Sequence, residues 1–343
     1  MSIVSNKPTI TRKEMEGVLD CLVNGELISG NSVKSFESSM SALVKLRFSL
    51  AVNSSTSAYH LIYKALEIGK DDEVIIPSFF DLAPLSALIL TGANASIVDI
   101  EENSFAPSLA QIKEKITPKT KAIVIGHLFG FPYHLKDLLD LNIPVIEDIS
   151  HSIGITHDDN VSNSIRVASF SPGSLITTGN GGIILTNNSR FYSTMKDYRE
   201  NNLKSHTISY DYSLTDFQAA MGIHQLSKLS DFIKRRREIA KTYFDAIKFT
   251  THKTLYHFSE DFMFQSFPLL FDSSVDKAET YWRKTKIEVI RPISVPLHKY
   301  LEFRPMDYPN SERLSNKLFS LPIYPTLTKK EIEKVSNAVA KFI

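Results

Sequence analysis

The stretch that decides the fold is Ser169-Phe-Ser-Pro-Gly-Ser174-Leu-Ile-Thr-Thr-Gly-Asn-Gly-Gly182. Its first residues end a β-branched run, a Pro-Gly turn follows, and the glycine-rich end leads into a second apolar run at 183–186. Glycine permits positive φ and a close approach of other backbone, so the fold requires this turn whether or not a ligand binds. The stretch therefore predicts two strands joined by a constrained loop.

Short β-branched runs alternate with helical patterns on both sides of this stretch. Such alternation is typical of an α/β fold, in which helices cover both faces of a mostly parallel sheet. Parallel sheets bind ligands at the carboxyl ends of their strands. We therefore expect the loops that begin at Asn53, Ser78, His127, Asp148 and Ser171 to share one crevice. The expected strands are 48–52, 73–77, 96–100, 122–126, 145–148, 167–170 and 183–186, and the expected helices include 57–66, 82–91, 108–116 and 133–139.

The pattern changes after residue 215. Apolar residues recur at helical spacing from there to about residue 247, which predicts one long helix. Beyond it we expect strands at 267–271 and 287–290, and a final helix from about Lys329. We divide the chain into a large α/β domain, 1–247, and a smaller α+β domain, 248–343. No flexible linker separates them, so we expect the two domains to be packed together.

Composition excludes several classes of function. The chain of 343 residues is 43% hydrophobic and 22% charged, as is ordinary for a soluble globular protein, and its net charge of +1 gives no sign of a nucleic-acid partner. No apolar run reaches the roughly 18 residues of a membrane helix, and the N-terminus shows no signal pattern. The single Cys21 suits the reducing cytoplasm, where we expect the protein. We interpret His157-Asp-Asp159 as a solvated loop, so we expect no metal site.

A set of short motifs resembles the DegT/StrS family of sugar aminotransferases, in family order and over nearly the whole chain. The resemblance implies a fold-type-I aminotransferase: a seven-stranded, mostly parallel sheet, a small C-terminal domain, and a homodimer with active sites at the subunit interface. Family members generally use pyridoxal phosphate (PLP) to transfer an amino group to a nucleotide-linked keto-sugar. The motifs are Asn53-Ser-Ser-Thr56, Asp72-Glu-Val-Ile-Ile-Pro77, Ile116-Thr-Pro-Lys-Thr-Lys-Ala122, His127-Leu-Phe-Gly130, Val145-Ile-Glu-Asp148, Gly179-Asn-Gly-Gly182, Asp216-Phe-Gln-Ala-Ala220, Arg235-Arg-Arg-Glu-Ile-Ala240, Pro296-Leu-His298 and Leu321-Pro-Ile-Tyr-Pro325.

The resemblance assigns cofactor-binding roles to four residues. Asp148 would bind the pyridine nitrogen, because an anion there keeps the nitrogen protonated, although a helix N-cap is the alternative. His151 would lie beside the cofactor ring, unless it is a structural histidine. Thr56, at the start of a helix, and Ser169 would bind the phosphate, unless they are simple cap or turn residues. By analogy, the Pro296-Leu-His298 motif would lie near a sugar-facing region.

Other positions depart from the family pattern at the same expected pocket. The cofactor lysine falls on Ser174, whose hydroxyl cannot form an imine with an aldehyde. Lys196 and Lys204 lie too far past the glycine turn to replace it. The aromatic residue that covers the cofactor ring falls on Asp81, which has no π face, and the phosphate-loop glycine falls on Ser55.

Further departures fall on the arm that family members send across the dimer interface to the phosphate. Its asparagine falls on Asp211 and its arginine on Ser213. A carboxylate in contact with a phosphate dianion is repelled by at least about 1 kcal/mol even in a water-like dielectric. The acidic residue of the usual Gly-Glu-Gly-Gly motif falls on Asn180.

Three hypotheses for the function remain open. The first is a degenerate homologue without transaminase activity that acts in nucleotide-sugar or polysaccharide biosynthesis. This hypothesis leaves open whether the chain binds any cofactor. The second is an active aminotransferase or dehydratase that holds PLP or pyridoxamine phosphate (PMP) non-covalently, supported by Asp148, His151 and Thr56. The third is a non-catalytic partner subunit of an intact paralogue. We prefer the first, because the departures converge on one pocket.

Overall fold

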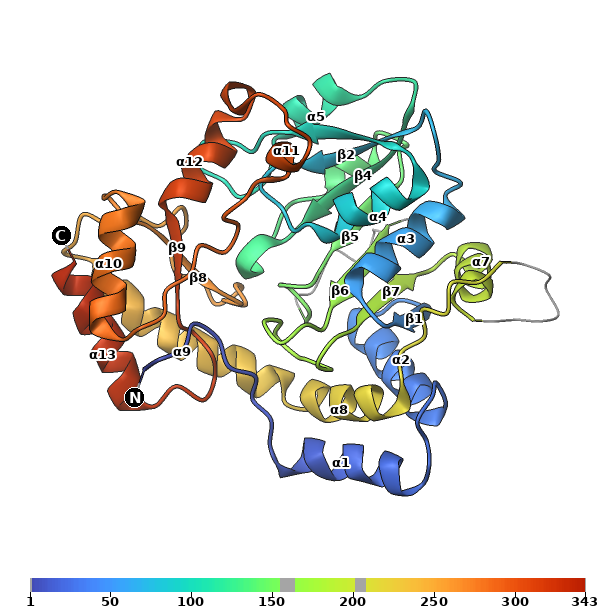
Figure 1. Ribbon diagram of the computed structural model, residues 1–343, viewed down its shortest axis with the longest axis horizontal. Coiled ribbons are helices and arrows are strands. Elements are labelled where there is room, and N and C mark those ends of the chain that lie inside the picture. The colour runs from blue at the N-terminus through green and yellow to red at the C-terminus, as the bar shows by residue number, and fades with distance from the viewer. Residues whose placement is uncertain (1, 155–163, 201–207, 343) are drawn as a thin grey trace.

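A seven-stranded sheet forms the centre of the larger part of the molecule in the computed structural model, which describes residues 2–154, 164–200 and 208–342 (Figure 1). The strand order is β1-β7-β6-β5-β4-β2-β3. Neighbouring strands are parallel, except that β7 runs antiparallel to β1 and β6. The mostly parallel seven-stranded sheet expected from the sequence is confirmed. Its strands are β1 (Phe48–Val52), β2 (Glu73–Pro77), β3 (Asn94–Val98), β4 (Thr120–Gly126), β5 (Val145–Asp148), β6 (Ile165–Ser169) and β7 (Gly182–Thr186).

Helices cover both faces of this sheet because its central strands are apolar on both sides. Val74 and Ile76 of β2 pack into the hydrophobic cluster under α3 and α4, whereas Ile75 packs into the cluster under α5. This division follows from the alternation of side chains along a strand, and apolar residues on both faces are typical of buried parallel strands. The covering helices are α2 (Asn31–Val44), α3 (Ser55–Ala65), α4 (Ala83–Thr91), α5 (Leu109–Lys115), α6 (Lys136–Leu139) and α7 (Ser189–Arg199).

The helix expected at 133–139 forms only from Lys136, as α6. The backbone N–H of Tyr133 donates to Nδ1 of His127 at 2.8 Å, which holds this segment out of a helix. A short 3₁₀ turn, η1 (Leu128–Gly130), comes between β4 and this segment.

The long helix expected from 215 to 247 was wrong, because two helices occupy this range. They are α8 (Asp216–Leu226) and α9 (Leu229–Ile247). At the break, the Ser227 hydroxyl donates to the His224 carbonyl at 2.8 Å and so competes with the helical hydrogen bonds. Lys228 instead reaches α1 (Arg12–Val23), where its Nζ donates to the Thr11 hydroxyl at 2.8 Å. Figure 1 shows α1 lying along α8 at the lower edge of the molecule.

The C-terminal part has its own hydrophobic cluster around two antiparallel strands, β8 (Phe267–Leu270) and β9 (Leu318–Leu321). Ile239 and Tyr243 of α9 also belong to this cluster, as does Ile3. The division of the chain at residue 247 therefore stays a prediction. The other elements of this part are α10 (Val275–Thr285), α11 (Leu297–Tyr300), η2 (Pro305–Asp307), α12 (Pro309–Lys317) and α13 (Lys329–Lys341).

The strand expected at 287–290 does not form. Ile287 makes an isolated bridge to Ile3, and Ile290 makes another to Ser320. The segment is thus paired with the N-terminal segment at one end and with β9 at the other, so no single partner follows it over successive residues.

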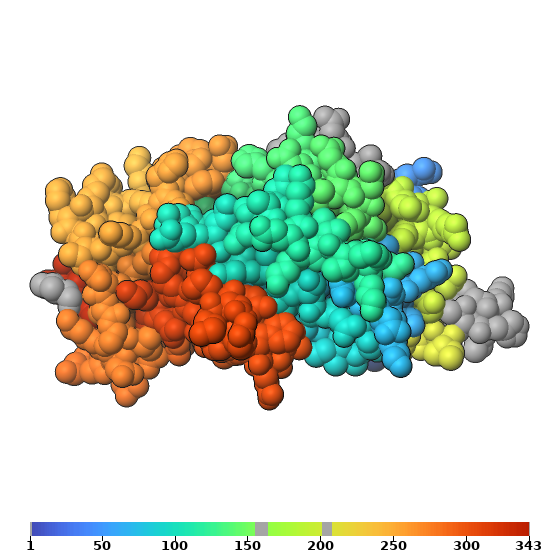
Figure 2. Space-filling view, turned by 90° about the horizontal axis from the view of Figure 1, so that it is seen from above, coloured from blue at the N-terminus to red at the C-terminus, as the bar shows by residue number. Residues whose placement is uncertain are grey.

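The C-terminal part packs directly against the sheet domain. Figure 2 shows the surface of α11 and α12 lying against the residues that follow β3. Backbone N–H groups of Asn310 and Ser311, at the start of α12, donate to the Asp99 carboxylate at 3.0 and 2.9 Å. None of the helices in the described ranges has the length and apolar character needed to span a membrane.

Candidate functional site

Asp148 lies at the carboxyl end of β5 and is buried. Its Oδ1 accepts the Ser150 backbone N–H at 2.8 Å, and its Oδ2 accepts the Tyr59 hydroxyl at 2.7 Å. The residues after it, through Gly154, form turns rather than a helix, so Asp148 is not an N-cap. Burial, together with the charge of Asp148, raises the pKa of Tyr59 well above its ordinary value. Tyr59 therefore stays protonated and donates at every ordinary pH.

His151 lies in the turn that follows Asp148. Its Nδ1 accepts the backbone N–H of Phe129 at 3.0 Å, and its ring stacks on the Phe129 ring at 6.0 Å between centroids. A neutral imidazole whose Nδ1 accepts must carry its proton on Nε2. The backbone contact thus fixes the tautomer of His151 and leaves Nε2–H as the donor for other groups.

Asp81 follows β2 and lies close enough to His151 and Asp148 to interact with both charges. Burial is the main cause that raises the pKa of Asp81, and the negative charge of Asp148 adds to it, while His151 acts in the opposite direction. The residue is nevertheless exposed to solvent in the single chain. We call the four side chains of Tyr59, Asp81, Asp148 and His151 the Asp148 cluster.

Helix α3 carries Tyr59 of this cluster in its second turn. Its N-cap is Ser54, whose hydroxyl accepts the Ser57 N–H at 3.1 Å, so Thr56 is not the cap residue. The first N–H groups of a helix have no partner within the helix, and they favour an anion. At the neighbouring strand, a Cβ on Gly182 would lie 2.7 Å from the Ser54 carbonyl oxygen. Glycine is required there because the start of α3 packs directly on β7.

The loop after β6 carries Ser174, the position at which the resemblance places the family's lysine. The Ser169 N–H donates to the Ser150 hydroxyl at 2.9 Å, which ties this loop to the residues after Asp148. The hydroxyls of Ser171 and Ser174 lie 3.2 Å apart, and no histidine or carboxylate pairs with Ser174 among the described residues. Lys7, which the sequence did not single out, lines a small cavity together with Ser174.

The arm expected to cross a dimer interface is only partly connected to the site within one chain. The Tyr212 carbonyl accepts the Asn53 N–H at 2.8 Å, and the Tyr212 hydroxyl lies 3.0 Å from Nδ1 of His60. Asp211 is exposed, with φ of 51°. No hydrogen bond in the described residues joins it to the Asp148 cluster. Ser213 bridges Val52 at the end of β1.

The remaining residues that the sequence analysis singled out do not belong to the Asp148 cluster. Asn180 is exposed, and its carbonyl accepts the hydroxyl of Thr178 at 2.7 Å. His157, Asp158, Asp159 and Lys204 lie outside the described residues.

His298 makes structural contacts, and the placement of its motif near a sugar-facing region stays a prediction. The residue is fully buried. Its Nδ1 lies 2.7 Å from the Ser78 hydroxyl and its Nε2 lies 2.9 Å from Glu312. These contacts join the end of β2 to α12, so the imidazole is held between the two parts of the chain.

Nothing in the sequence distinguishes Tyr59 as a site residue. It lies in an apolar helical pattern with Leu61, Ile62 and Tyr63, which is typical of a core residue. Only the packing of α3 on the sheet brings its hydroxyl to Asp148.

The profile of the DegT/DnrJ/EryC1/StrS aminotransferase family matches residues 8–340. The chain belongs to this family. GDP-perosamine synthase of Escherichia coli O157:H7 is 30% identical over 355 residues, which cover 98% of this chain and 97% of that protein. The spore coat polysaccharide biosynthesis protein SpsC of Bacillus subtilis is 27% identical, with 98% and 96% covered.

Solved structures share the fold. The PMP form of Spr1654 from Streptococcus pneumoniae, a putative sugar aminotransferase, has a TM-score of 0.92 at 23% identity, with 100% of this chain and 98% of that chain covered. DesV from S. venezuelae has a TM-score of 0.89 at 24% identity, with 96% and 93% covered.

Proposed function

We propose that this chain is a non-transaminating member of the family that binds a nucleotide-linked sugar in nucleotide-sugar or polysaccharide biosynthesis. The observation that carries the proposal is Ser174, which stands where the resemblance places the cofactor lysine and whose side chain pairs with the Ser171 hydroxyl. A hydroxyl cannot replace an amine in covalent attachment of an aldehyde cofactor. The names of the polysaccharide-related relatives support the context.

The residues of the Asp148 cluster fit only part of a PLP group. Each oxygen of Asp148 accepts one hydrogen bond from the chain itself, so acceptor capacity remains for a ring N–H. The start of α3 suits a phosphate. Ser174 offers no amine, and Asp81 adds a second carboxylate where the resemblance expects an aromatic ring. The fit thus extends to a free cofactor at most, and it does not extend to a covalently held one.

A second candidate is an enzyme that holds PMP non-covalently. Such a cofactor would supply the amino group for transfer to a keto-sugar. The specific observation in its favour is His151, whose Nε2–H is available as a donor because Nδ1 is engaged by the Phe129 backbone. In this candidate Asp148 orients the ring and His151 holds a proton beside it.

A role as partner of an intact paralogue is less well supported. The resemblance implies that the arm reaches the phosphate of the other subunit. The same arm would carry the Asp211 carboxylate to the cofactor phosphate of an active partner, where like charges repel and would weaken the partner's site. We therefore favour a homodimer over a mixed dimer with an active chain.

The exposed face of α1 supports a homodimer. Met15, Leu19 and Val23 are exposed at a spacing of four residues, and Val23 is 75% exposed, while the opposite face packs on α8. An apolar stripe of this kind marks an interaction surface. Light scattering of the purified chain should give the mass of two chains. Leu19→Lys should reduce that mass, whereas Asp20→Lys, one residue further on, should leave it unchanged.

The test of the proposed function is covalent capture and amino transfer. The purified chain is incubated with PLP, reduced with borohydride and analysed by mass spectrometry, and amino transfer from glutamate to a nucleotide-linked keto-sugar is measured in parallel. We expect no lysine adduct at the site and no transfer. Ser174→Lys should gain an adduct, whereas the matched control Ser171→Lys should not. Transfer by the unaltered chain, or an adduct on Lys7 that supports transfer, would overturn the proposal.

A further inference from the structure

Arg236 of α9 is a buried cation, only 3% exposed to solvent. Its Nη1 donates to three backbone carbonyls, those of Gln265 at 2.8 Å, Ile323 at 2.9 Å and Phe264 at 3.4 Å. These are all the hydrogen bonds of its side chain among the described residues, so no carboxylate offsets its charge. Burial lowers the pKa of Arg236 to about 10, and the guanidinium therefore stays charged at neutral pH. A buried charge without a partner of opposite sign destabilises the fold.

One edge of this guanidinium is unused. Arginine carries five N–H donors in a rigid fork. The contacts of Arg236 within the described ranges use Nη1 alone, and Nε is enclosed without a hydrogen-bond partner. In a planar guanidinium, Nε–H and one N–H of Nη2 lie side by side. The free edge therefore presents two parallel donors.

Arg236 lines the small cavity that Lys7 and Ser174 also line, which has a volume of about 10 Å³. We call it the Arg236 cavity and define it by Lys7, Thr9, Ser174, Gln225 and Arg236. The Thr9 hydroxyl is buried and, like Nε of Arg236, has no partner in the part of the chain that the structure describes. Two cations and no carboxylate line this cavity. Its volume is room for one water or one small ion.

Thr9 is held in place by its neighbours. Nε2 of Gln225 donates to the Thr9 carbonyl at 2.8 Å. The side chain of Asn6 donates to the Pro172 carbonyl at 3.0 Å, which fastens the N-terminal segment to the loop that carries Ser174. Donors fixed in this way need little ordering when an acceptor binds between them.

A single water is the ordinary explanation for unpaired donors around a cavity of this size. Water would satisfy the hydrogen bonds but would leave the buried positive charge uncompensated. An anion of similar size does both, because an acceptor that carries a negative charge forms a stronger hydrogen bond with a guanidinium. Charge therefore favours an anion over water, and the volume favours a monatomic anion over a phosphate.

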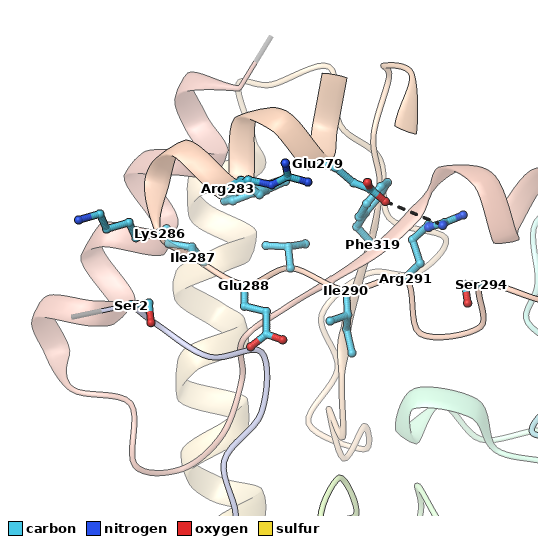
Figure 3. A pocket seen from close by; sticks show the side chains of 12 residues that line it. Ser2, Glu279, Arg283, Lys286, Ile287, Glu288, Ile290, Arg291, Ser294 and Phe319 are labelled. Carbon is cyan, nitrogen blue, oxygen red and sulfur yellow. Dashed lines mark ion pairs between the residues drawn. The ribbon is translucent and has the colours of Figure 1, made fainter. Parts of the chain in front are cut away.

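The cations of a larger hollow beside α10 differ from Arg236 (Figure 3). Arg291 pairs there with Glu279 at 3.8 Å, as the dashed line shows. Lys286 is exposed, and its side chain points away from the other lining residues. Water and a carboxylate already stabilise these charges, so that hollow needs no anion. Arg236 is both buried and unpaired, and it gains from one.

We propose that the Arg236 cavity binds one chloride ion, held by Nε–H and Nη2–H of Arg236 and by the hydroxyl of Thr9. The exposed Lys7 adds a second positive charge to the lining. The ion would join the N-terminal segment to α9 beside Ser174, so chloride should stabilise the folded chain. The inference does not depend on the proposed function, because it requires neither cofactor nor sugar.

Crystals of the full chain grown in sodium bromide test the site directly, because bromide gives an anomalous signal and water does not. We expect an anomalous peak in the Arg236 cavity, in contact with the guanidinium and with Oγ1 of Thr9. Thr9→Val keeps the shape of the side chain, removes the hydroxyl and should lose most of the peak. An ordered water without anomalous signal at this place, or no density at all, would overturn the proposal.

Thermal unfolding in solution measures the affinity. Sodium chloride replaces sodium gluconate at constant ionic strength, since gluconate is too large for the cavity. We expect the melting temperature to rise with chloride and to level off as the site fills. Thr9→Val should weaken chloride binding about tenfold, as for a lost hydrogen bond to a charged group. Thr242→Val is the matched control, because Thr242 also lies on α9 and its hydroxyl donates to the Glu238 carbonyl of the same helix at 3.2 Å.

The outcomes of this titration are distinct. Arg236→Met should abolish the dependence on chloride, and if that variant does not fold, the two threonine variants still decide. Equal melting temperatures in the two salts, or the same chloride dependence for Thr9→Val as for Thr242→Val, would contradict the assignment. Amino transfer is measured separately, so this proposal and the proposed function fail independently.

Discussion

Glu147 and Asp148 are neighbours in β5, yet they lie in opposite electrostatic surroundings. Side chains alternate between the faces of a sheet, so the two carboxylates point to different sides. Glu147 is fully buried and is contacted by Nε2 of His127 at 2.8 Å and by Nε of Arg166 at 2.7 Å. Asp148 is contacted by neutral donors, Tyr59 and the Ser150 N–H, with the Asp81 carboxyl nearby.

The comparison separates a structural charge from one available to a ligand. A buried carboxylate is stable when a cation and hydrogen bonds compensate it, as at Glu147. At Asp148 the hydrogen bonds come from neutral groups, and its neighbour Asp81 is held with a raised pKa. The Asp148 side of the strand can therefore gain from a cationic or donor group of a ligand, and the Glu147 side cannot.

The largest expected effect is on the compensated side. Arg166→Ala leaves Glu147 buried with its arginine removed, and the free energy of unfolding should fall by about 3–5 kcal/mol. Denaturant titration measures the change. Asp148→Asn, which keeps the shape and leaves no charge unpaired, is the comparison variant and should have a clearly smaller effect. Equal losses for the two variants would remove the distinction between the two sides of β5.

Tyr59→Phe tests the neutral donor of Asp148. Loss of a hydrogen bond to a buried carboxylate should lower the free energy of unfolding by about 1.5–3 kcal/mol. Tyr63→Phe is the matched control, because Tyr63 is equally buried one turn further along α3 and its hydroxyl reaches only the Pro84 carbonyl, at 3.3 Å. If the control lost as much stability as Tyr59→Phe, the charge of Asp148 would have no special part in this contact.

Glu14 of α1 extends the comparison, because its carboxylate pairs with a compensating cation, Lys228, from the junction of α8 and α9. Burial alone would raise its pKa, but hydrogen bonds from Lys228, Thr11 and Gln225 outweigh burial and lower the pKa of Glu14 to about 2. A lowered folded-state pKa gives stability that is present above the unfolded value of 4.5 and is lost as the pH falls toward 2. The advantage of the unaltered chain over Glu14→Gln should therefore shrink from pH 5 downward, as thermal unfolding at several pH values would measure. A constant advantage across this range would contradict the assignment.

Asp81 should respond in the opposite direction, with the smallest effect. Its raised folded-state pKa means that its contribution to stability is fully present below the unfolded value of 3.8 and is lost as the pH rises through the folded value. Asp81→Asn should therefore raise the melting temperature slightly at neutral pH and not at low pH. A lower melting temperature at neutral pH would show that the Asp81 charge is stabilising instead.

Much of the sheet could be predicted from local pattern alone. β1, β2 and β5 begin and end where their apolar, β-branched runs do, whereas β3 begins at Asn94, two residues before the expected start. The failures arose where distant contacts decide. Helix α8 ends where the Ser227 hydroxyl donates to the His224 carbonyl and Lys228 reaches Thr11 at the start of α1. The segment at 287–290 has two different partners. Periodicity carries no information about such partners.

The sequence alone determined the family, the seven strands of the large sheet and the hydroxyl at Ser174, because motifs, apolar runs and residue identity are properties of the chain itself. Tertiary structure decided which groups surround each charge. The Tyr59 hydroxyl meets Asp148 across 89 residues of chain, and the Asp99 carboxylate accepts backbone N–H groups at the start of α12. These contacts depend on how helices pack against strands, and on nothing that a single stretch of sequence contains.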